Sequence, residues 1–312
     1  MSLPNKLAFV FPGQGSQAVG MGQNLYESFS EAMAVFDAAN AALGFDLAQL
    51  MFQGPEEELI KTINTQPALL TASVAALRVV ESKGIRPSIT AGHSVGEYAA
   101  LVAAGALDFS DAVRLVRRRG ELMSEVGASQ PGTMAAILGS TADEVRAAVE
   151  AAQSAGIVDV ANFNSPGQVV ISGSPEGVEE AARIAKERGA KRAIPLKVSG
   201  AFHSRLMASA ADGMANELKH ATINDPVIPV IANVTADYVR TADDIREALA
   251  KQIMGSVRWE ESVRKMAEDG VEGFIELGSG TVLAGLINKT VSDVYIKSVG
   301  DTGSLESLLA DN

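Results

Sequence analysis

The segment that decides the fold spans residues 89–97 and reads Ile-Thr-Ala-Gly-His-Ser-Val-Gly-Glu. Residues 88–91 predict a short strand, and the Ala-rich residues 95–104 predict the helix that follows it. Between them, Ser94 stands in Gly-x-Ser-x-Gly, which is typical of a strained strand-to-helix turn that pushes the serine hydroxyl out above a sheet. We expect glycine at 92 and 96 because neighbouring chain passes close to such a turn.

The rest of the first third of the chain alternates in the same way between strand-like and helix-like segments. Residues 7–11 predict a first strand, and residues 67–83 predict a helix that ends at Gly84. The alternation resumes after residue 202, with late strands at 274–277 and 294–299. This order favours an α/β core with a mostly parallel sheet.

The middle of the chain has a different rhythm. Its segments predict strands and helices in the order β-α-β-β-α-β, at residues 134–138, 141–155, 158–163, 168–173, 175–188 and 192–198. That order is the ferredoxin-like unit. We therefore predict a discontinuous core at 1–127 and 201–312, with a ferredoxin-like subdomain inserted at 128–200.

Composition restricts the possible functions. The 312 residues include no cysteine, which excludes thiol catalysis, disulfides and thiolate metal sites. A net charge of −12 argues against nucleic-acid binding, and three histidines leave little room for a metal centre. No apolar stretch approaches the roughly 20 residues of a membrane span, and residues 1–11 do not resemble a secretory signal. We therefore expect a cytoplasmic protein with no metal and no membrane contact.

The turn at residues 92–96 makes Ser94 a candidate covalent nucleophile for acyl transfer. The following helix directs its N-terminal amides and positive dipole end toward charge that builds up near Ser94, and the N–H of Val95 is the natural first oxyanion donor. The pentapeptide alone also occurs by chance in a Gly-rich chain, so the strand–turn–helix context carries the interpretation. We expect no catalytic role for Glu97, because an acid in a first helical turn is favourable anyway.

Serine needs a base, and histidine is the usual one. His93 is adjacent to Ser94, but successive side chains diverge, so it is not expected to reach the hydroxyl. His220 lies in a polar stretch beside Lys219 and is expected to be solvated. By elimination the base is His203, which lies where the inserted unit returns to the core.

Residues 110–125 predict a helix capped by Ser110 or Asp111, with one apolar face. Arg119 falls on that face, where a guanidinium is costly unless it meets an anion. Two interpretations stay open: a structural salt bridge with an internal carboxylate, or an anchor for a carboxylate on the substrate.

Residues 12–18 formally satisfy G-x-G-x-x-G/A after a strand, which raises a dinucleotide-binding hypothesis. That motif requires a second strand ending in an acid about 20 residues on, whereas residues 31–43 predict a helix. The better interpretation is a loop whose backbone amides, that of Gln14 above all, approach a reacting oxygen.

Taken together, six motifs resemble the malonyl-CoA:acyl-carrier-protein transacylase family over nearly the whole chain. They are Pro-Gly-Gln-Gly-Ser-Gln at 12–17, Thr-Gln-Pro-Ala at 65–68, Gly-His-Ser-Val-Gly-Glu at 92–97, Asn-Phe-Asn-Ser-Pro-Gly-Gln at 162–168, Ala-Phe-His-Ser at 201–204 and Glu-Leu-Gly-Ser-Gly at 276–280. Family members often carry Leu after the nucleophile. Val95 departs from this mildly, since only its amide matters.

The resemblance implies a hydrolase-like α/β core with an inserted ferredoxin-like subdomain and an active site between them. It implies that Ser94 takes a malonyl group and that His203 acts as base and then acid, with no aspartate as third member. The remaining implied roles are an oxyanion hole from the amides of Gln14 and Val95, a carboxylate anchor at Arg119, and a main-chain carbonyl at Gln252 that orients the histidine.

The implied reaction is ping-pong transfer from malonyl-CoA to the phosphopantetheine thiol of acyl carrier protein, supplying fatty-acid synthesis. CoA and phosphopantetheine enter as parts of substrates, so no resident cofactor is expected, and the expected oligomeric state is a monomer. The alternatives are a free-standing acyltransferase of a polyketide pathway, a serine esterase or thioesterase, and a non-catalytic carrier-protein scaffold. Two basic clusters are candidates for carrier docking or are simply solvated faces: Arg114, Arg117 and Arg118, and Lys186, Arg188, Lys191 and Arg192.

Overall fold

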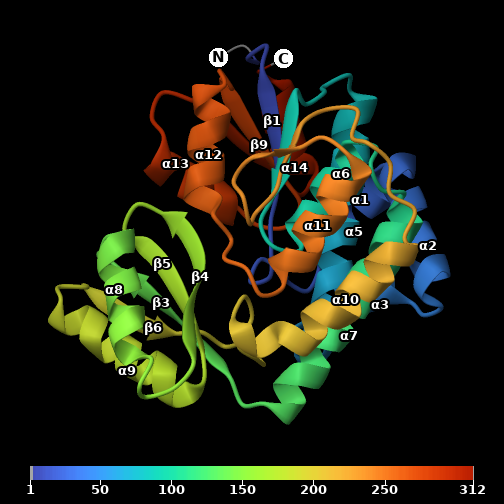
Figure 1. Ribbon diagram of the computed structural model, residues 1–312. Coiled ribbons are helices and arrows are strands. Elements are labelled where there is room, and N and C mark those ends of the chain that lie inside the picture. The colour runs from blue at the N-terminus through green and yellow to red at the C-terminus, as the bar shows by residue number, and fades with distance from the viewer. Residues whose placement is uncertain (1–2, 312) are drawn as a thin grey trace.

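The computed structural model describes residues 3–311, and its strands form two separate sheets (Figure 1). The larger sheet has six strands in the order β10-β9-β1-β2-β7-β8. Their neighbours pair in parallel except for the antiparallel pair β7 and β8. The strands are β1 Leu7–Phe11, β2 Ile89–Gly92, β7 Val230–Ile231, β8 Tyr238–Val239, β9 Gly273–Leu277 and β10 Tyr295–Val299. The predicted α/β core with a mostly parallel sheet is confirmed.

Strand β1 shows why this sheet is buried on both faces. All five of its residues are buried. Alternate side chains point to opposite faces. Phe9 and Phe11 join the large apolar cluster with helices α5 (Thr62–Ser82) and α6 (Gly96–Ala103). Ala8 and Val10 join a second cluster under helices α12 (Trp259–Glu268) and α13 (Val282–Thr290). Figure 1 shows α12 and α13 on one side of the strands and α5 and α6 on the other.

Twelve helices in the described residues belong to this core. They are α1 Gln23–Ser28, α2 Ser30–Leu43, α3 Leu47–Gln53, α4 Glu56–Leu59, α5 Thr62–Ser82, α6 Gly96–Ala103, α7 Phe109–Ser129, α10 Ala208–His220, α11 Ala242–Gln252, α12 Trp259–Glu268, α13 Val282–Thr290 and α14 Thr302–Leu309, and a 3₁₀ turn at Arg205–Met207 precedes α10.

Two helix starts differ from the sequence prediction. Helix α5 begins at Thr62, ahead of Pro67. Pro67 leaves the Ile63 carbonyl without its usual N–H donor, and Arg117 Nη1 donates to that carbonyl at 3.2 Å. Helix α7 is capped by Asp108, whose side chain accepts from the N–H of Ser110, so the expected cap at Ser110 or Asp111 is wrong.

The smaller sheet is antiparallel, with strand order β4-β5-β3-β6. Its elements follow the predicted order β-α-β-β-α-β, so the ferredoxin-like topology is confirmed. They are β3 Thr133–Leu138, α8 Ala142–Ala152, β4 Val158–Ser165, β5 Gln168–Gly173, α9 Pro175–Glu187 and β6 Arg192–Pro195. The exact division of the chain at residues 128 and 200 stays a prediction.

The two faces of the smaller sheet have different partners. Ile137, Val169 and Ile171 pack with α8 and α9 in a cluster of their own, whereas Met134 and Val170 belong to the large apolar cluster of the core. The subdomain therefore lies against the core through one face of its sheet (Figure 1).

Within residues 3–311, none of the helices combines the length and apolar character that crossing a membrane requires.

Candidate active site

Ser94 occupies the turn between β2 and α6 in a left-handed backbone conformation, with φ 52°. The turn is tight because a Cβ at Gly92 would lie 1.9 Å from the carbonyl oxygen of Gly96, and a Cβ at Gly96 would lie 2.1 Å from that of Phe11. Any side chain at either position would collide with backbone. The predicted strained turn, and the reason for its glycines, are confirmed.

The structure brings His203 to the serine. Ser94 Oγ and His203 Nε2 lie 2.8 Å apart. The other ring nitrogen, Nδ1, faces two main-chain carbonyls, those of Gln252 at 2.8 Å and Gly255 at 3.1 Å. Carbonyls only accept, so Nδ1 carries the proton of the neutral imidazole, and Nε2 is left to accept from the serine hydroxyl.

Burial keeps this imidazole neutral. His203 is 4% exposed, and its burial, followed by the positive charge of Arg119, lowers its pKa to about 3. The carbonyls of Gln252 and Gly255 oppose this shift but do not outweigh it. At neutral pH the ring is therefore in the form that can take a proton.

The other two histidines lie where the sequence predicts. His93 turns away from Ser94 and makes a 2.8 Å contact with Asn164 Oδ1, with its ring 5.8 Å from that of Trp259. His220 is exposed at the end of α10.

Arg119 is 1% exposed on the apolar face of α7, as predicted, and its guanidinium reaches the serine. Nη2 donates to Ser94 Oγ at 3.1 Å and to Gln252 Oε1 at 3.0 Å, and Nη1 donates to Gln66 Oε1 at 2.8 Å. All three acceptors are neutral. In the part of the chain that the structure describes, Arg119 makes no ion pair with a carboxylate, and its buried Nε has no partner. The structural salt bridge that the sequence left open is therefore absent from these residues.

The glycine loop lies against the serine turn. A Cβ at Gly13 would lie 2.6 Å from the carbonyl oxygen of His93, so only glycine permits this approach. Gln14 is the next residue of the loop, and its Nε2 donates to Thr62 Oγ1 at 3.3 Å. Within residues 3–311, neither the N–H of Gln14 nor that of Val95 donates to a protein acceptor. Both main-chain donors are therefore available to a bound group beside Ser94.

Sequence reasoning missed Asn233, which holds the serine turn in place. Its Oδ1 accepts from the N–H of Ser94 at 2.7 Å, and its Nδ2 donates to the Gly92 carbonyl at 2.6 Å. Asn233 follows β7, the neighbour of β2 in the sheet, and is 1% exposed. A polar amide just after a short apolar strand was the available signal.

The sequence also did not reveal that Glu97 is buried within the site. Its side chain is 2% exposed, and Oε2 accepts from the N–H of Asn233 at 2.9 Å and from Gln252 Nε2 at 2.8 Å. Burial raises the pKa of Glu97 to about 7, against the opposing hydrogen bonds from Asn233 and Gln252 and the charge of Arg119. Glu97 is an acid of the first turn of α6, as expected, and it is also a buried member of the site.

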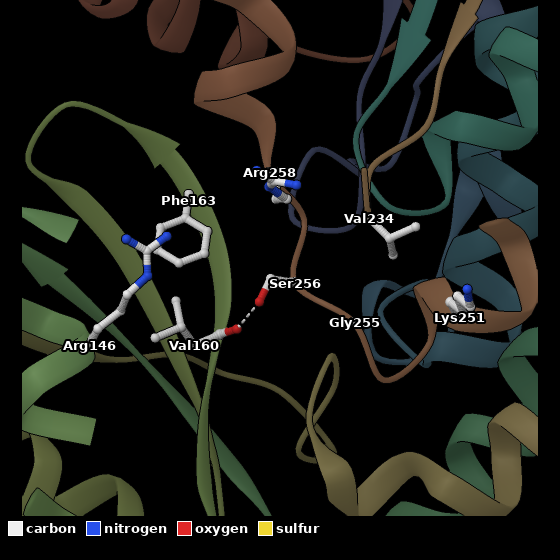
Figure 2. Close-up of a pocket in the computed structure, with 8 residues that line it drawn as sticks. All are labelled: Arg146, Val160, Phe163, Val234, Lys251, Gly255, Ser256 and Arg258. Carbon is white, nitrogen blue, oxygen red and sulfur yellow. Dashed lines mark hydrogen bonds between the residues drawn. The ribbon is translucent and has the colours of Figure 1, made fainter. Parts of the chain in front are cut away.

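A pocket of about 580 Å³ lies between β4 and residues 251–258, the segment whose main-chain carbonyls contact His203 Nδ1 (Figure 2). The Arg146 guanidinium lies 4.4 Å from the centroid of the Phe163 ring on one side, and Gly255 lines the other. Each of its three cations is already paired with a carboxylate: Arg146 with Asp143, Lys251 with Glu247 and Arg258 with Glu261. Its positive charge is therefore compensated.

The geometry agrees with what the chain is similar to. A family model described as acyl transferase domain matches residues 8–306. The malonyl CoA-acyl carrier protein transacylase of Bacillus subtilis (strain 168) is 50% identical over 303 residues, covering 97% of this chain and 96% of that protein. The protein of the same name from Escherichia coli (strain K12) is 48% identical over 305 residues, covering 97% and 99%.

Solved structures agree as well. An acyl carrier protein S-malonyltransferase from Vibrio cholerae has a TM-score of 0.94 at 45% identity, covering 97% of this chain and all of that one. A malonyl-transacylase in complex with a type II PKS acyl-carrier protein has a TM-score of 0.95 at 46% identity, covering 99% of this chain and 100% of that one. Because these matches extend over nearly the whole chain, the protein belongs to the malonyl CoA-acyl carrier protein transacylase family of acyl transferases.

Proposed function

We propose that this protein transfers the malonyl group of malonyl-CoA to the phosphopantetheine thiol of acyl carrier protein through a malonyl-serine at Ser94. In the first half-reaction, Ser94 Oγ attacks the thioester carbonyl and its proton passes to His203 Nε2. The C–S bond then breaks, and the proton leaves with the CoA thiol. In the second half-reaction the carrier thiol attacks the malonyl-serine, His203 takes its proton and returns it to Ser94 Oγ.

Two main-chain amides stabilise the negative oxygen that forms in each half-reaction. Within residues 3–311, the N–H groups of Gln14 and Val95 have no internal acceptors, Val95 directly follows Ser94, and the N-terminus of α6 adds its dipole. Removal of one such donor costs about 10²–10³ in turnover in sites of this kind. The carbonyl of Gln252 holds His203 in the tautomer that the reaction needs.

The observation that carries this assignment is the buried Arg119, whose Nη2 lies 3.1 Å from Ser94 Oγ. Its acceptors are neutral, so its charge is uncompensated at hydrogen-bond distance and suits the free carboxylate of a malonyl group. A serine esterase or thioesterase shares Ser94 and His203 but gains nothing from such a cation.

Incubation with malonyl-CoA followed by intact mass measurement tests the proposal. We expect a malonyl adduct that persists on the protein, disappears in Ser94→Ala, and is discharged by carrier protein carrying phosphopantetheine. Rapid release of free malonate without accumulation of the adduct indicates a hydrolase. Complete absence of thioester exchange indicates a scaffold with no activity.

The pathway that receives the malonyl group is fatty-acid synthesis in this proposal. One similar structure contains a type II PKS carrier, so supply of a polyketide pathway is the second candidate. Discharge rates with a fatty-acid carrier and with a polyketide carrier, measured side by side on the same malonyl-enzyme, distinguish the two.

Carrier docking is assigned to Lys191 and Arg192 at the start of β6. Both are exposed, and within the described chain neither forms an ion pair. The other basic cluster is neutralised by carboxylates, since Arg114 pairs with Asp111, Arg117 with Glu121, and Arg118 with Glu121, Glu125 and Glu217. Unpaired cations attract an acidic partner more strongly than paired ones.

Charge reversal at Lys191 and Arg192 tests this docking surface. We expect a higher KM for carrier protein and unchanged malonyl loading, with Arg114→Glu as the control that alters neither. Equal changes in both half-reactions, or no change in either, contradict the docking site.

We further propose that the protein acts as a cytoplasmic monomer with no resident metal or cofactor.

A further inference from the structure

The buried carboxyl of Glu97 has no part in the reaction as written above, yet it lies at the centre of the site. Oε2 accepts two hydrogen bonds, from the N–H of Asn233 and from Gln252 Nε2. Asn233 holds the serine turn, and Gln252 touches Arg119. Glu97 therefore joins the two parts of the site that must keep a fixed distance: the nucleophile and the guanidinium.

The side chain of Gln252 is the link between Glu97 and Arg119. Its Nε2 carries two hydrogens and has two acceptors, Glu97 Oε2 at 2.8 Å and the Ser94 carbonyl at 3.0 Å. Its Oε1 faces Arg119 Nη2 at 3.0 Å. An amide with both hydrogens bonded cannot rotate without losing a bond, and Gln252 is fully buried, so no water replaces the loss.

We propose that Glu97 is a positioning residue: by accepting from Gln252 Nε2 it fixes the Gln252 amide with its oxygen toward Arg119, and so sets the guanidinium where a malonyl carboxylate binds. This inference rests on the proposed function and adds a residue to its selectivity for acyl groups that carry a carboxylate. The required property of residue 97 is an acceptor at the Oε2 position, not a negative charge.

The test measures binding of malonyl-CoA, acetyl-CoA and CoA by calorimetry in a Ser94→Ala background, where no acyl group is transferred. Acetyl-CoA lacks only the carboxylate, so the ratio of its Kd to that of malonyl-CoA reports on Arg119 alone. The variants are Glu97→Leu, which removes the acceptor, and Glu97→Gln, which retains an oxygen for Gln252. Gln252→Met removes the link but keeps the main-chain carbonyl for His203.

We expect Glu97→Leu and Gln252→Met to weaken malonyl-CoA by roughly tenfold or more while acetyl-CoA and CoA change little, as for a lost hydrogen bond to a charged group. Glu97→Gln retains the wild-type ratio. The double variant Glu97→Leu/Gln252→Met loses no more than either single one, because both act through the same link.

Several outcomes overturn the inference. One is an unchanged ratio in Glu97→Leu, and another is equal weakening of all three ligands, which is the mark of a structural role. Loss in Glu97→Gln as large as in Glu97→Leu assigns the effect to charge. If Glu97→Leu does not fold, an unchanged ratio in Gln252→Met, or a loss of the malonyl preference in Glu97→Gln, refutes it.

Arg119→Ala separates this inference from the proposed function. If Arg119→Ala loses the malonyl preference and Glu97→Leu keeps it, the anchor stands and the positioning role is refuted. If Arg119→Ala also keeps the preference, both the anchor and the positioning role fail. Transfer to carrier protein by the wild type, measured separately, is untouched by either result.

Discussion

Replacement of Arg119 by alanine tests directly whether its guanidinium binds the carboxylate of the malonyl group. The substitution removes a guanidinium that is 1% exposed and that makes three hydrogen bonds to Gln66, Ser94 and Gln252, all of them to neutral oxygens. It leaves His203 and its carbonyl partners in place. A malonyl carboxylate that enters the variant is buried with no cation, whereas an acetyl group loses nothing.

The size of the effect follows from that burial. Removing one partner of a buried, hydrogen-bonded charge pair costs about 2–5 kcal/mol, much of it the desolvation of the group left behind. At about 1.4 kcal/mol per factor of ten, the second-order rate constant for acylation by malonyl-CoA should fall by roughly 30- to 4,000-fold. The constant for acetyl-CoA should stay within about tenfold, because only one of the three lost hydrogen bonds, that to Ser94 Oγ, involves a reacting atom.

The assay is single-turnover acylation, followed by CoA release and by the mass of the acyl-enzyme, with malonyl-CoA and acetyl-CoA in parallel. Arg114→Ala, on the exposed face of the same helix, is the matched control and should change neither rate. The thermal midpoint of each variant shows whether the fold is intact. Equal losses for the two acyl groups would refute the anchor, since they would mean that Arg119 supports the serine and not the substrate.

Three further predictions concern the turn and its buried partners. Gly92→Ala forces a Cβ to 1.9 Å from the carbonyl oxygen of Gly96. We therefore expect both a lower midpoint in thermal denaturation and a loss of acylation, and normal activity would contradict the close approach. Asn233→Ala removes both side-chain bonds to the serine turn and should destabilise the protein by about 2–4 kcal/mol in denaturant titrations, with full stability as the opposing result. Burial raises the pKa of Glu97 from 4.5 to about 7. Between these two values the folded state keeps a proton that the unfolded state loses, so the free energy of unfolding falls as the pH rises through this range. Glu97→Gln should remove about 3 kcal/mol of that fall between pH about 4.5 and 8, whereas parallel pH curves for wild type and variant would show that the carboxyl is not the cause.

The local patterns of the chain were sufficient for the fold and for part of the site. The motif at residues 92–96 predicted the conformation of Ser94, since the two glycines and the strand–turn–helix order are local properties. The helical spacing that places Arg119 among apolar residues predicted its burial, because a period of 3.6 residues determines which face a side chain occupies. His203 followed by elimination among three histidines.

The contacts that the sequence did not reveal are those between the side chains of distant segments. Asn233 contacts Ser94 across a separation of 139 residues, and Gln252 contacts Glu97 across 155. No period or cap signals such a contact, because it depends on which strands become neighbours in the sheet. For the same reason Glu97 looked like an ordinary acid of a first helical turn, although the loop after β7 and the end of α11 cover it.

The arrangement around Arg119 explains how the site can hold a buried charge without cancelling it. A carboxylate in direct contact would stabilise the guanidinium but would compete with the carboxylate of the substrate. The structure instead surrounds Arg119 with the amide oxygens of Gln66 and Gln252, which accept hydrogen bonds but carry no charge, and places Glu97 behind Gln252. A carboxyl whose pKa is about 7 is only partly ionised at neutral pH, so it opposes an incoming anion less than an ordinary glutamate would. Selectivity for a charged acyl group therefore depends on neutral neighbours as much as on the arginine. Replacing Gln66 by Glu should abolish malonyl loading, even though it would create a salt bridge with Arg119.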